Sequence, residues 1–368
     1  MSHGIPLLRT GTLRLMGNAA TDALPPTIHP EHDKVPKRRP PDRSQVLRWF
    51  FQTLFLLLNL YIGLEFFRFV LYYESAGGSS WVSRPPGVEG WLPIASLMNL
   101  KLWILTGKVP AIHPAGVFLF ISFATISLLL RKSFCGWLCP VGTISEWLWR
   151  MGRRLLGRNW ALPRWLDIPL RSVKYLLLAL FLYAVASMSL EALNEFAMSP
   201  YGLIADVKML NFFRYLSFTA ATVLIILAIA SVAIRNFWCR YLCPYGALMG
   251  LLGWFSPLHI RRNPQRCIDC GKCGRECPAS LPVDKLRIVQ SPECMACFQC
   301  VAVCPARNAL WMSAGTCARV PAWAIALGIA VIFFGIMGLA RYTGHWRTNL
   351  PGELYMYLIP RAQQFSHP

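Results

Sequence analysis

Histidine is scarce in this chain of 368 residues, which contains seven of them. A haem inside a membrane commonly takes two histidine ligands. Only His113 falls near a stretch apolar enough to lie in a bilayer, and His345 follows the last such stretch. We therefore predict that the protein binds no haem.

Two other kinds of segment are missing. The sequence has no Walker-type phosphate-binding run and no G-x-G-x-x-G run after a predicted strand, so it gives no support for a nucleotide cofactor. Residues 1–46 hold no apolar run long enough for a cleavable signal peptide and are rich in proline and basic residues. We expect these residues to form a flexible basic tail in the cytoplasm.

Acidic residues are also few, 17 against 37 lysines and arginines, which gives a formal net charge of +20. The cations mostly flank apolar segments and cysteine motifs, so we expect no nucleic-acid partner. Apolar residues make up 55% of the chain, too many for an ordinary soluble domain. The composition predicts an integral membrane protein whose surroundings are the lipid bilayer.

About five apolar stretches approach the length of a membrane-spanning helix. Lysine and arginine gather before the first stretch, after the second and after the fourth. By the positive-inside rule, the N-terminus and these loops are cytoplasmic and the C-terminus is periplasmic, as in a multi-pass protein of the bacterial inner membrane. The predicted spans are residues 49–72, 113–130, 174–190, 215–234 and 321–340.

Eight of the thirteen cysteines form two copies of one spacing, C-x2-C-x2-C-x3-C-P. This is the ligand run of bacterial two-cluster ferredoxins, in which the cysteine before proline binds the other cluster. Zinc sites use two well-separated cysteine pairs instead, and a reducing cytoplasm disfavours disulfides. The pattern predicts two [4Fe-4S] clusters, the first held by Cys267, Cys270, Cys273 and Cys304 and the second by Cys294, Cys297, Cys300 and Cys277.

Four more cysteines stand in an internal repeat, C-x2-L-C-P-x-G, which contains Cys135 and Cys139 in its first copy and Cys239 and Cys243 in its second. Each copy follows an even-numbered span, so both pairs should reach the same membrane surface. Proline after the second cysteine suits the first turn of a new helix, whose positive end favours a thiolate. Three interpretations stay open: a further redox centre, a site that binds or reduces copper, and a metal-free dithiol or structural pair.

Together these motifs resemble the membrane-bound polyferredoxins of the NapH, NosR and cytochrome-oxidase-accessory superfamily. The resemblance covers about residues 49–340. It implies electron exchange between the quinone pool and clusters at the cytoplasmic face, with delivery to a redox partner that the sequence does not identify. The protein would then be an electron carrier, with a role as a quinol dehydrogenase component left open.

A quinol headgroup needs a proton acceptor and hydrogen-bond donors near the membrane interface. Glu65 and Arg68 lie on one face of the first span towards its outer end, and His113 opens the second span at the same depth. Charged residues are costly in such places and are often functional, so these three are the candidate quinol site. The alternative is a satisfied ion pair and an interfacial histidine.

The predicted fold is therefore an α-helical integral membrane protein with about five spans and a small α+β domain like a two-cluster ferredoxin. We divide the chain into a tail (1–46), a membrane domain with four spans (47–257), a ferredoxin-like domain (258–312), and a fifth span with a short periplasmic tail (313–368). Two other functions fit these motifs, a copper-handling or copper-reducing assembly factor for a respiratory metalloenzyme and a membrane redox sensor.

Overall fold

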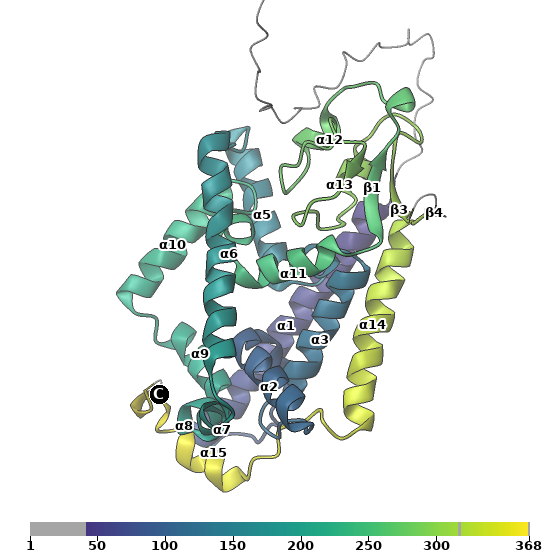
Figure 1. Ribbon diagram of the computed structural model, residues 1–368. Coiled ribbons are helices and arrows are strands. Elements are labelled where there is room, and N and C mark those ends of the chain that lie inside the picture. Colours follow the sequence, from purple (N-terminus) through teal and green to yellow (C-terminus); the bar gives the residue numbers. More distant parts are fainter. Residues whose placement is uncertain (1–41, 316–317, 367–368) are drawn as a thin grey trace, which may run out of the picture. The chain divides into compact units, whose positions relative to one another are not determined.

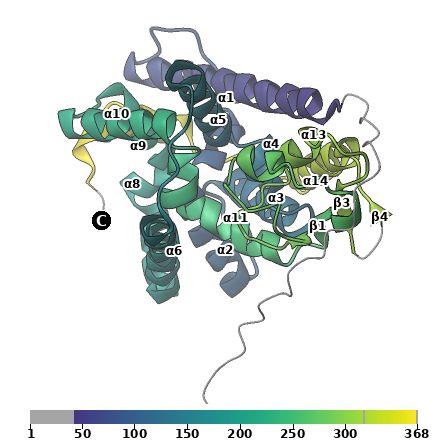
Figure 2. The same cartoon turned by 90° about the horizontal axis from the view of Figure 1, so that it is seen from above.

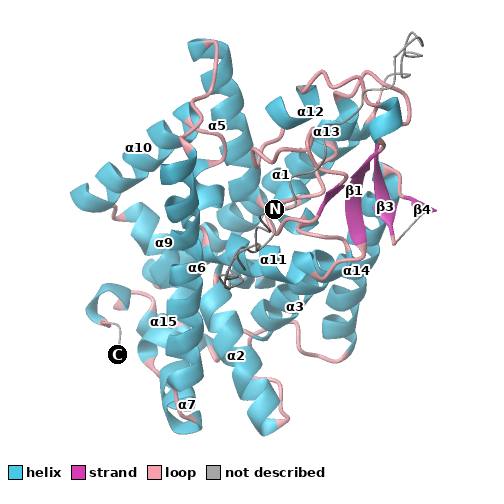
Figure 3. Ribbon diagram, turned by 45° about the horizontal axis from the view of Figure 1, so that its top comes forward, coloured by secondary structure: helices cyan, strands magenta, loops and turns pink. Residues whose placement is uncertain are grey.

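The computed structural model describes residues 42–315 and 318–366, so most of the predicted flexible tail lies outside the described residues. Helices dominate the described part, and Figure 3 shows a single small sheet beside them. The longer helices are α1 (Ser44–Glu74), α2 (Pro93–Thr106), α3 (Pro114–Leu129), α5 (Pro140–Leu156), α6 (Arg164–Ser187), α9 (Ala205–Arg214), α10 (Phe218–Ala233), α11 (Pro244–Trp254) and α14 (Ala322–Tyr342). Shorter elements are η1 (Pro86–Trp91), α4 (Ser133–Trp137), α7 (Leu190–Met198), α8 (Pro200–Leu203), the π-helical turn η2 (Trp238–Leu242), η3 (Pro264–Arg266), α12 (Lys272–Arg275), α13 (Gln299–Ala302), α15 (Gly352–Leu358) and η4 (Ala362–Gln364).

Among the described residues, three helices are long and apolar enough to cross a membrane: α1, α6 and α14. Helices α9 and α10 add a fourth span if they count as one broken helix, since they meet at a bend of 81°. The 16 residues of α3 are apolar but fewer than a straight crossing usually needs. The structure thus supports a membrane protein, and the count of five spans stays a prediction.

Helix α6 begins at Arg164, well before the predicted stretch that starts at residue 174. Pro163 precedes its first turn, and Asp167 places negative charge at the positive end of the helix. The first turns of α6 mix polar and apolar residues, so a search for a continuous apolar stretch does not include them in the helix.

Helices α1 and α3 run in opposite directions between two ends of the described fold. The first turn of α1 lies by the cysteine-rich segment, where Gln45 donates a hydrogen bond to the carbonyl of Cys297 (2.9 Å). The far end of α1 packs against α15, where the rings of Tyr73 and Tyr355 lie 5.5 Å apart. Helix α3 runs the opposite way. It lies beside α14 (Figures 1 and 2). Arg131 follows it, and the buried guanidinium of this residue donates to the carbonyl oxygens of Leu258 in β1 and Val289 in β2.

The internal repeat folds as two helix pairs, α3 with α5 and α10 with α11, each joined through a short helical turn that carries a cysteine. The pairs pack crosswise: α5 of the first lies against α10 of the second, and α11 of the second lies against α3 of the first. Gly152 allows the α5–α10 crossing, because a Cβ atom there would overlap the carbonyl oxygen of Val232. This crosswise packing brings the two C-x3-C-P motifs of the repeat close to each other.

The sheet is antiparallel, with strand order β2-β1-β3-β4. Ile260 at its centre pairs with Val289 on one side and Met312 on the other, and these side chains pack against the cysteine loops in the main hydrophobic core. The strands are β1 (Leu258–Arg262), β2 (Ile288–Val289), β3 (Leu310–Ala314) and β4 (Ala318–Arg319). A small α+β unit is therefore present, while its likeness to a ferredoxin stays a prediction.

Candidate metal centres

The four cysteines of the internal repeat line one pocket. Cys139 and Cys243 are the residues directly before helices α5 and α11, which begin at Pro140 and Pro244. The amide of Gly246 donates to the sulfur of Cys243 (3.2 Å), a contact that favours the thiolate and opposes the effect of burial on the pKa of Cys243. Sequence spacing thus predicted these two helix starts correctly, and the structure brings the two cysteine pairs together.

Two lysines and one glutamate adjoin this pocket. Glu293 accepts a hydrogen bond from the ammonium of Lys174 (2.5 Å) and lies 3.6 Å from that of Lys132. Tyr175 donates a further hydrogen bond to the same carboxylate (3.0 Å). Burial alone would raise the pKa of Glu293, but the two lysines hold it at about 2. The group therefore carries an excess of positive charge, and Lys132 lies within electrostatic range of Cys135 and Cys243.

Burial raises the pKa of all four thiols, that of Cys139 to about 11. Without a metal they would be protonated at neutral pH, and metal binding would release their protons. The thiolates would then supply the negative charge that the buried lysines lack. Soft sulfur donors with surplus positive charge beside them fit an anionic iron-sulfur cluster.

The two ferredoxin-type runs have the same backbone. Asp269 and Ala296, which precede the second cysteine of each run, both have φ of 48°, and Gly271 and Phe298, which follow it, have φ of 67° and 57°. Left-handed residues next to right-handed ones turn successive amide groups inward and form the concave anion sites seen around iron-sulfur clusters. Three of these four residues are not glycine, so the loops hold a costly conformation.

Each run's last cysteine lies near the other run. The neighbours that act electrostatically on Cys273 include Cys304 and Cys267, and burial together with these thiols raises its pKa to about 11. Cys277 instead has Cys297 and Cys294 as neighbours, and burial with these thiols raises its pKa to about 12. This exchange of last cysteines is the arrangement that the spacing predicts, and the ligand sets themselves stay a prediction.

Among the described residues, no three histidine, cysteine or acidic side chains form a group that could hold a single metal ion. A cubane cluster holds its cysteines at separate corners, so it requires wider spacing than one ion does. The support for clusters comes from the paired cysteine loops and the four-cysteine pocket themselves.

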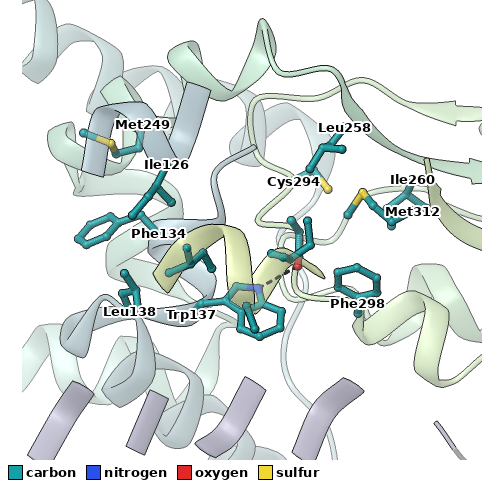
Figure 4. Packing of buried hydrophobic residues seen from close by; sticks show 14 of the residues in the cluster. Ile126, Phe134, Trp137, Leu138, Met249, Leu258, Ile260, Cys294, Phe298 and Met312 are labelled. Carbon is teal, nitrogen blue, oxygen red and sulfur yellow. Dashed lines mark hydrogen bonds between the residues drawn. The ribbon is translucent and has the colours of Figure 1, made fainter. Parts of the chain in front are cut away.

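The four-cysteine pocket and the second ferredoxin-type run are interlocked. Gly136, between Cys135 and Cys139, packs on the chain at Met295 so closely that a Cβ atom would lie 2.8 Å from that carbonyl oxygen. Trp137 next to it is fully buried, and Figure 4 shows its indole hydrogen bond reaching into the same loop, beside Cys294 and Phe298.

The second copy of the repeat makes an equivalent contact. Arg240, between Cys239 and Cys243, donates to the hydroxyl of Ser280 (2.7 Å), three residues after Cys277. Both loops that carry the predicted ligands of the second cluster thus touch the four-cysteine pocket.

Family models match the segments that carry these motifs. A 4Fe-4S binding domain matches residues 112–159 and again 216–263, and a 4Fe-4S dicluster domain matches residues 259–305. The first model matches both copies of the internal repeat, each with one cysteine pair.

Curated relatives agree with these matches. The chain is 48% identical over 322 residues to YccM of Escherichia coli (strain K12), named as a candidate electron transport protein, covering 86% of this chain and 90% of YccM. The chain belongs to the NapH/NosR family of membrane-associated 4Fe-4S ferredoxin-type proteins. It is 28% identical to the ferredoxin-type protein NapH of Escherichia coli (strain K12) over 47% of this chain and 59% of NapH. It is 31% identical to the regulatory protein NosR of Pseudomonas aeruginosa over 50% of this chain and only 25% of NosR. No solved structure matches the chain.

In this member of the NapH/NosR family, the three candidate quinol residues do not share one network. Glu65 pairs with Arg68 (3.2 Å) on the exposed side of α1. His113 is buried and lies 3.0 Å from a guanidinium nitrogen of Arg84 and 3.0 Å from the carbonyl oxygen of Gly202. Their role with quinol stays a prediction.

The buried partners of His113 form a polar cluster that no pattern in the sequence predicts. Arg84 binds Glu89 (2.6 Å) and Asp206 (2.7 Å), and Glu89 also accepts from the amide of Gly116 in the first turn of α3. In the sequence these are ordinary loop charges. Lys132 is likewise an ordinary loop charge in the sequence. Lys174 lies inside an apolar helix and Glu293 lies beside Cys294, and charged residues at such positions are signals that a closer search of the sequence would find.

Proposed function

We propose that this protein is a membrane-bound one-electron carrier that relays electrons between the quinone pool and a redox partner. Two [4Fe-4S] clusters would do this work, one on Cys267, Cys270, Cys273 and Cys304, the other on Cys294, Cys297, Cys300 and Cys277. The matched 4Fe-4S models and the electron-transport relatives support iron-sulfur electron transfer. The protein would hold each cluster and set its potential, distance and access.

A third [4Fe-4S] centre is part of this proposal, shared by Cys135, Cys139, Cys239 and Cys243. The observation that carries it is the meeting of four partly buried thiols from two 4Fe-4S repeats in one pocket beside surplus positive charge. Each repeat supplies only two donors, so both are needed for one cluster.

The contacts suggest an order for the relay. The four-cysteine pocket touches both ligand loops of the second cluster, at Met295 and Ser280. Cys277, Cys294 and Cys300 are buried, whereas Cys267, Cys270 and Cys304 of the first cluster are partly exposed. Electrons would pass from the four-cysteine centre to the buried cluster, then to the exposed one, and from there to a partner, or in the reverse direction.

Iron counting tests the proposal. Full-length protein purified without oxygen should contain about twelve iron and about twelve acid-labile sulfide atoms per chain, the content of three cubane clusters. Replacing the four repeat cysteines by serine should lower both to about eight and remove one EPR signal. About eight iron in wild type and variant alike would make the four cysteines non-ligands, and stoichiometric copper lost in the variant would favour the copper-handling function instead.

Quinol is the proposed electron source, and Glu65, Arg68 and His113 remain the candidates for its site. In Glu65→Gln and His113→Gln, a soluble quinol analogue should reduce the clusters more slowly, while dithionite should reduce them as in wild type. Because Glu65 and His113 lie in separate networks, loss in only one of the variants would locate the site. Normal rates in both would remove these residues from the proposal.

The proposed topology places the N-terminus, the loop of residues 131–173 and the clusters in the cytoplasm and the C-terminus in the periplasm, at the bacterial inner membrane. The opposite directions of α1 and α3 support it. An alkaline phosphatase fusion after residue 368 should be active and one after residue 312 inactive. The reverse pattern would contradict the topology.

A further inference from the structure

The two lysines beside the four-cysteine pocket, Lys132 and Lys174, are more deeply buried than a charged side chain usually is without a partner of opposite charge. The side chain of Lys174 is fully buried and that of Lys132 is 5% exposed, while Glu293 is 10% exposed. Buried charges are costly unless they are paired, and here two cations share one carboxylate. The described residues around Glu293 add the hydroxyl of Tyr175, which brings no charge.

The missing negative charge lies in the pocket. Lys132 lines it together with the four cysteines, and both lysines act electrostatically on Cys135 and Cys243. A cubane cluster with four thiolate ligands is an anion, and its negative charge grows by one on reduction. Fixed positive charge nearby stabilises the reduced form more than the oxidised form.

Glu293 determines the positions of the two lysine ammonium groups. It holds both ammonium groups and directly precedes Cys294 of the second ferredoxin-type run. One carboxylate therefore ties a lysine that follows α3 and a lysine of α6 to the loop of the neighbouring cluster. A lysine pair held in this way stays beside the four-cysteine pocket.

We infer that Lys132 and Lys174, oriented by Glu293, are positioning residues that raise the reduction potential of the four-cysteine centre. The inference rests on the third centre of the proposed function. The step concerned is a one-electron reduction of the cluster iron. In the membrane one quinol, oxidised to quinone with release of two protons, would supply the electrons for two such steps, and in the test dithionite supplies them. No bond between the protein and the cluster forms or breaks in it.

The test is an EPR-monitored redox titration of the full-length protein in detergent, with iron and sulfide measured on each sample. In Lys132→Met and in Lys174→Met, one of three midpoints should fall, corresponding to about a tenfold lower equilibrium constant for reduction, or about 59 mV for one electron. Lys132→Arg keeps the charge and should restore most of the potential. Lys108→Met, at an exposed position, is the control and should change nothing.

Glu293→Gln should shift the midpoint in the opposite direction. This variant keeps the inference testable if a lysine variant fails to assemble its cluster. Glutamine keeps a side-chain oxygen that accepts from Lys174 and Tyr175, so both lysines stay in place, and removal of the negative charge alone should raise the midpoint of the four-cysteine centre. Unchanged midpoints in both lysine variants with about twelve iron bound, or a lower midpoint in Glu293→Gln, would overturn the inference and leave the third cluster intact. About eight iron in the wild type would instead refute the third cluster itself.

Discussion

The indole nitrogen of Trp137 donates a hydrogen bond to the carbonyl oxygen of Ala296, 3.0 Å away. Trp137 stands between Cys135 and Cys139, and Ala296 stands between Cys294 and Cys297. One buried hydrogen bond thus joins the loop of the four-cysteine pocket to the loop of the neighbouring ferredoxin-type run.

Trp137→Phe tests this link. Phenylalanine keeps an aromatic ring but removes the donor, and the buried Ala296 carbonyl then loses its partner at a cost of about 1–3 kcal/mol. We expect a lower melting temperature and slower electron transfer between the two centres after flash reduction, with iron content unchanged. Trp323→Phe, at a side chain that is 63% exposed, is the matched control. Equal melting temperatures and rates in the two variants would show that the bond does not couple the loops.

Lys101 caps the end of α6. Its ammonium donates to the carbonyl oxygens of Val185 (2.9 Å), Ala186 (2.9 Å) and Met188 (2.6 Å), where a helix leaves its last carbonyls unpaired. Lys101→Met should destabilise the protein by about 1–2 kcal/mol, since a cation there also favours the negative helix end. Thermal unfolding in detergent measures it, with the exposed Lys108→Met as reference. A loss no larger than in the reference would contradict the capping role.

Glu89 should make stability depend on acid. Burial alone would raise its pKa, but Arg84 and His113 lower it from 4.5 to about 2. A carboxyl with a lowered pKa in the folded state stabilises the protein fully above pH 4.5 and loses this contribution as the pH falls from 4.5 towards 2. The contribution at neutral pH is about 3 kcal/mol.

Glu89→Gln should therefore be less stable than wild type at pH 7, and the difference should shrink below pH 4.5. Melting curves of the two proteins between pH 7 and pH 3.5 measure this difference, and cluster loss in acid affects both alike. Glu353→Gln, at an exposed position, should show no such trend. A stability difference that stays constant with pH would rule out the lowered pKa.

Arg48 and Glu146 form a buried pair at 2.6 Å, whereas Arg68 and Glu65 form a more exposed pair at 3.2 Å. Arg48→Met removes the hydrogen bonds of a charged donor to a buried carboxylate that keeps Arg150 (2.7 Å) as a partner, and should cost about 1.5–3 kcal/mol. Arg68→Met should cost about 0–1 kcal/mol. Chemical denaturation of both variants measures the two losses in free energy of unfolding. Similar losses would mean that burial does not determine how much each ion pair stabilises the protein.

The sequence predicted best those features that depend on neighbouring residues. Proline after Cys139 and after Cys243 fixes the start of a helix, and the structure has helices beginning at both places. The repeated spacing of the ferredoxin-type runs likewise appears as a repeated backbone, with Asp269 and Ala296 in the same left-handed conformation.

Features that depend on distant partners were not predictable in this way. His113 was grouped with Glu65 and Arg68 by depth along the helices, but its contacts are with Arg84 and Gly202, and depth says nothing of the direction a side chain takes. The lysine pair at Glu293 joins residues more than a hundred positions apart in sequence. Apolar length also could not settle the number of spans, because α3 is short and α9 and α10 meet at a bend.

The crosswise packing of α5 on α10 and of α11 on α3 has a consequence for ancestry. Either half of the duplicated unit offers two sulfur donors, and its partner half must supply the rest. A forerunner with a single unit would have needed a second molecule of itself, related by a twofold axis, to complete the same set of four. Joining the two units in one polypeptide makes that assembly independent of concentration and lets the halves diverge, as Trp137 and Tyr241 at matching places already have.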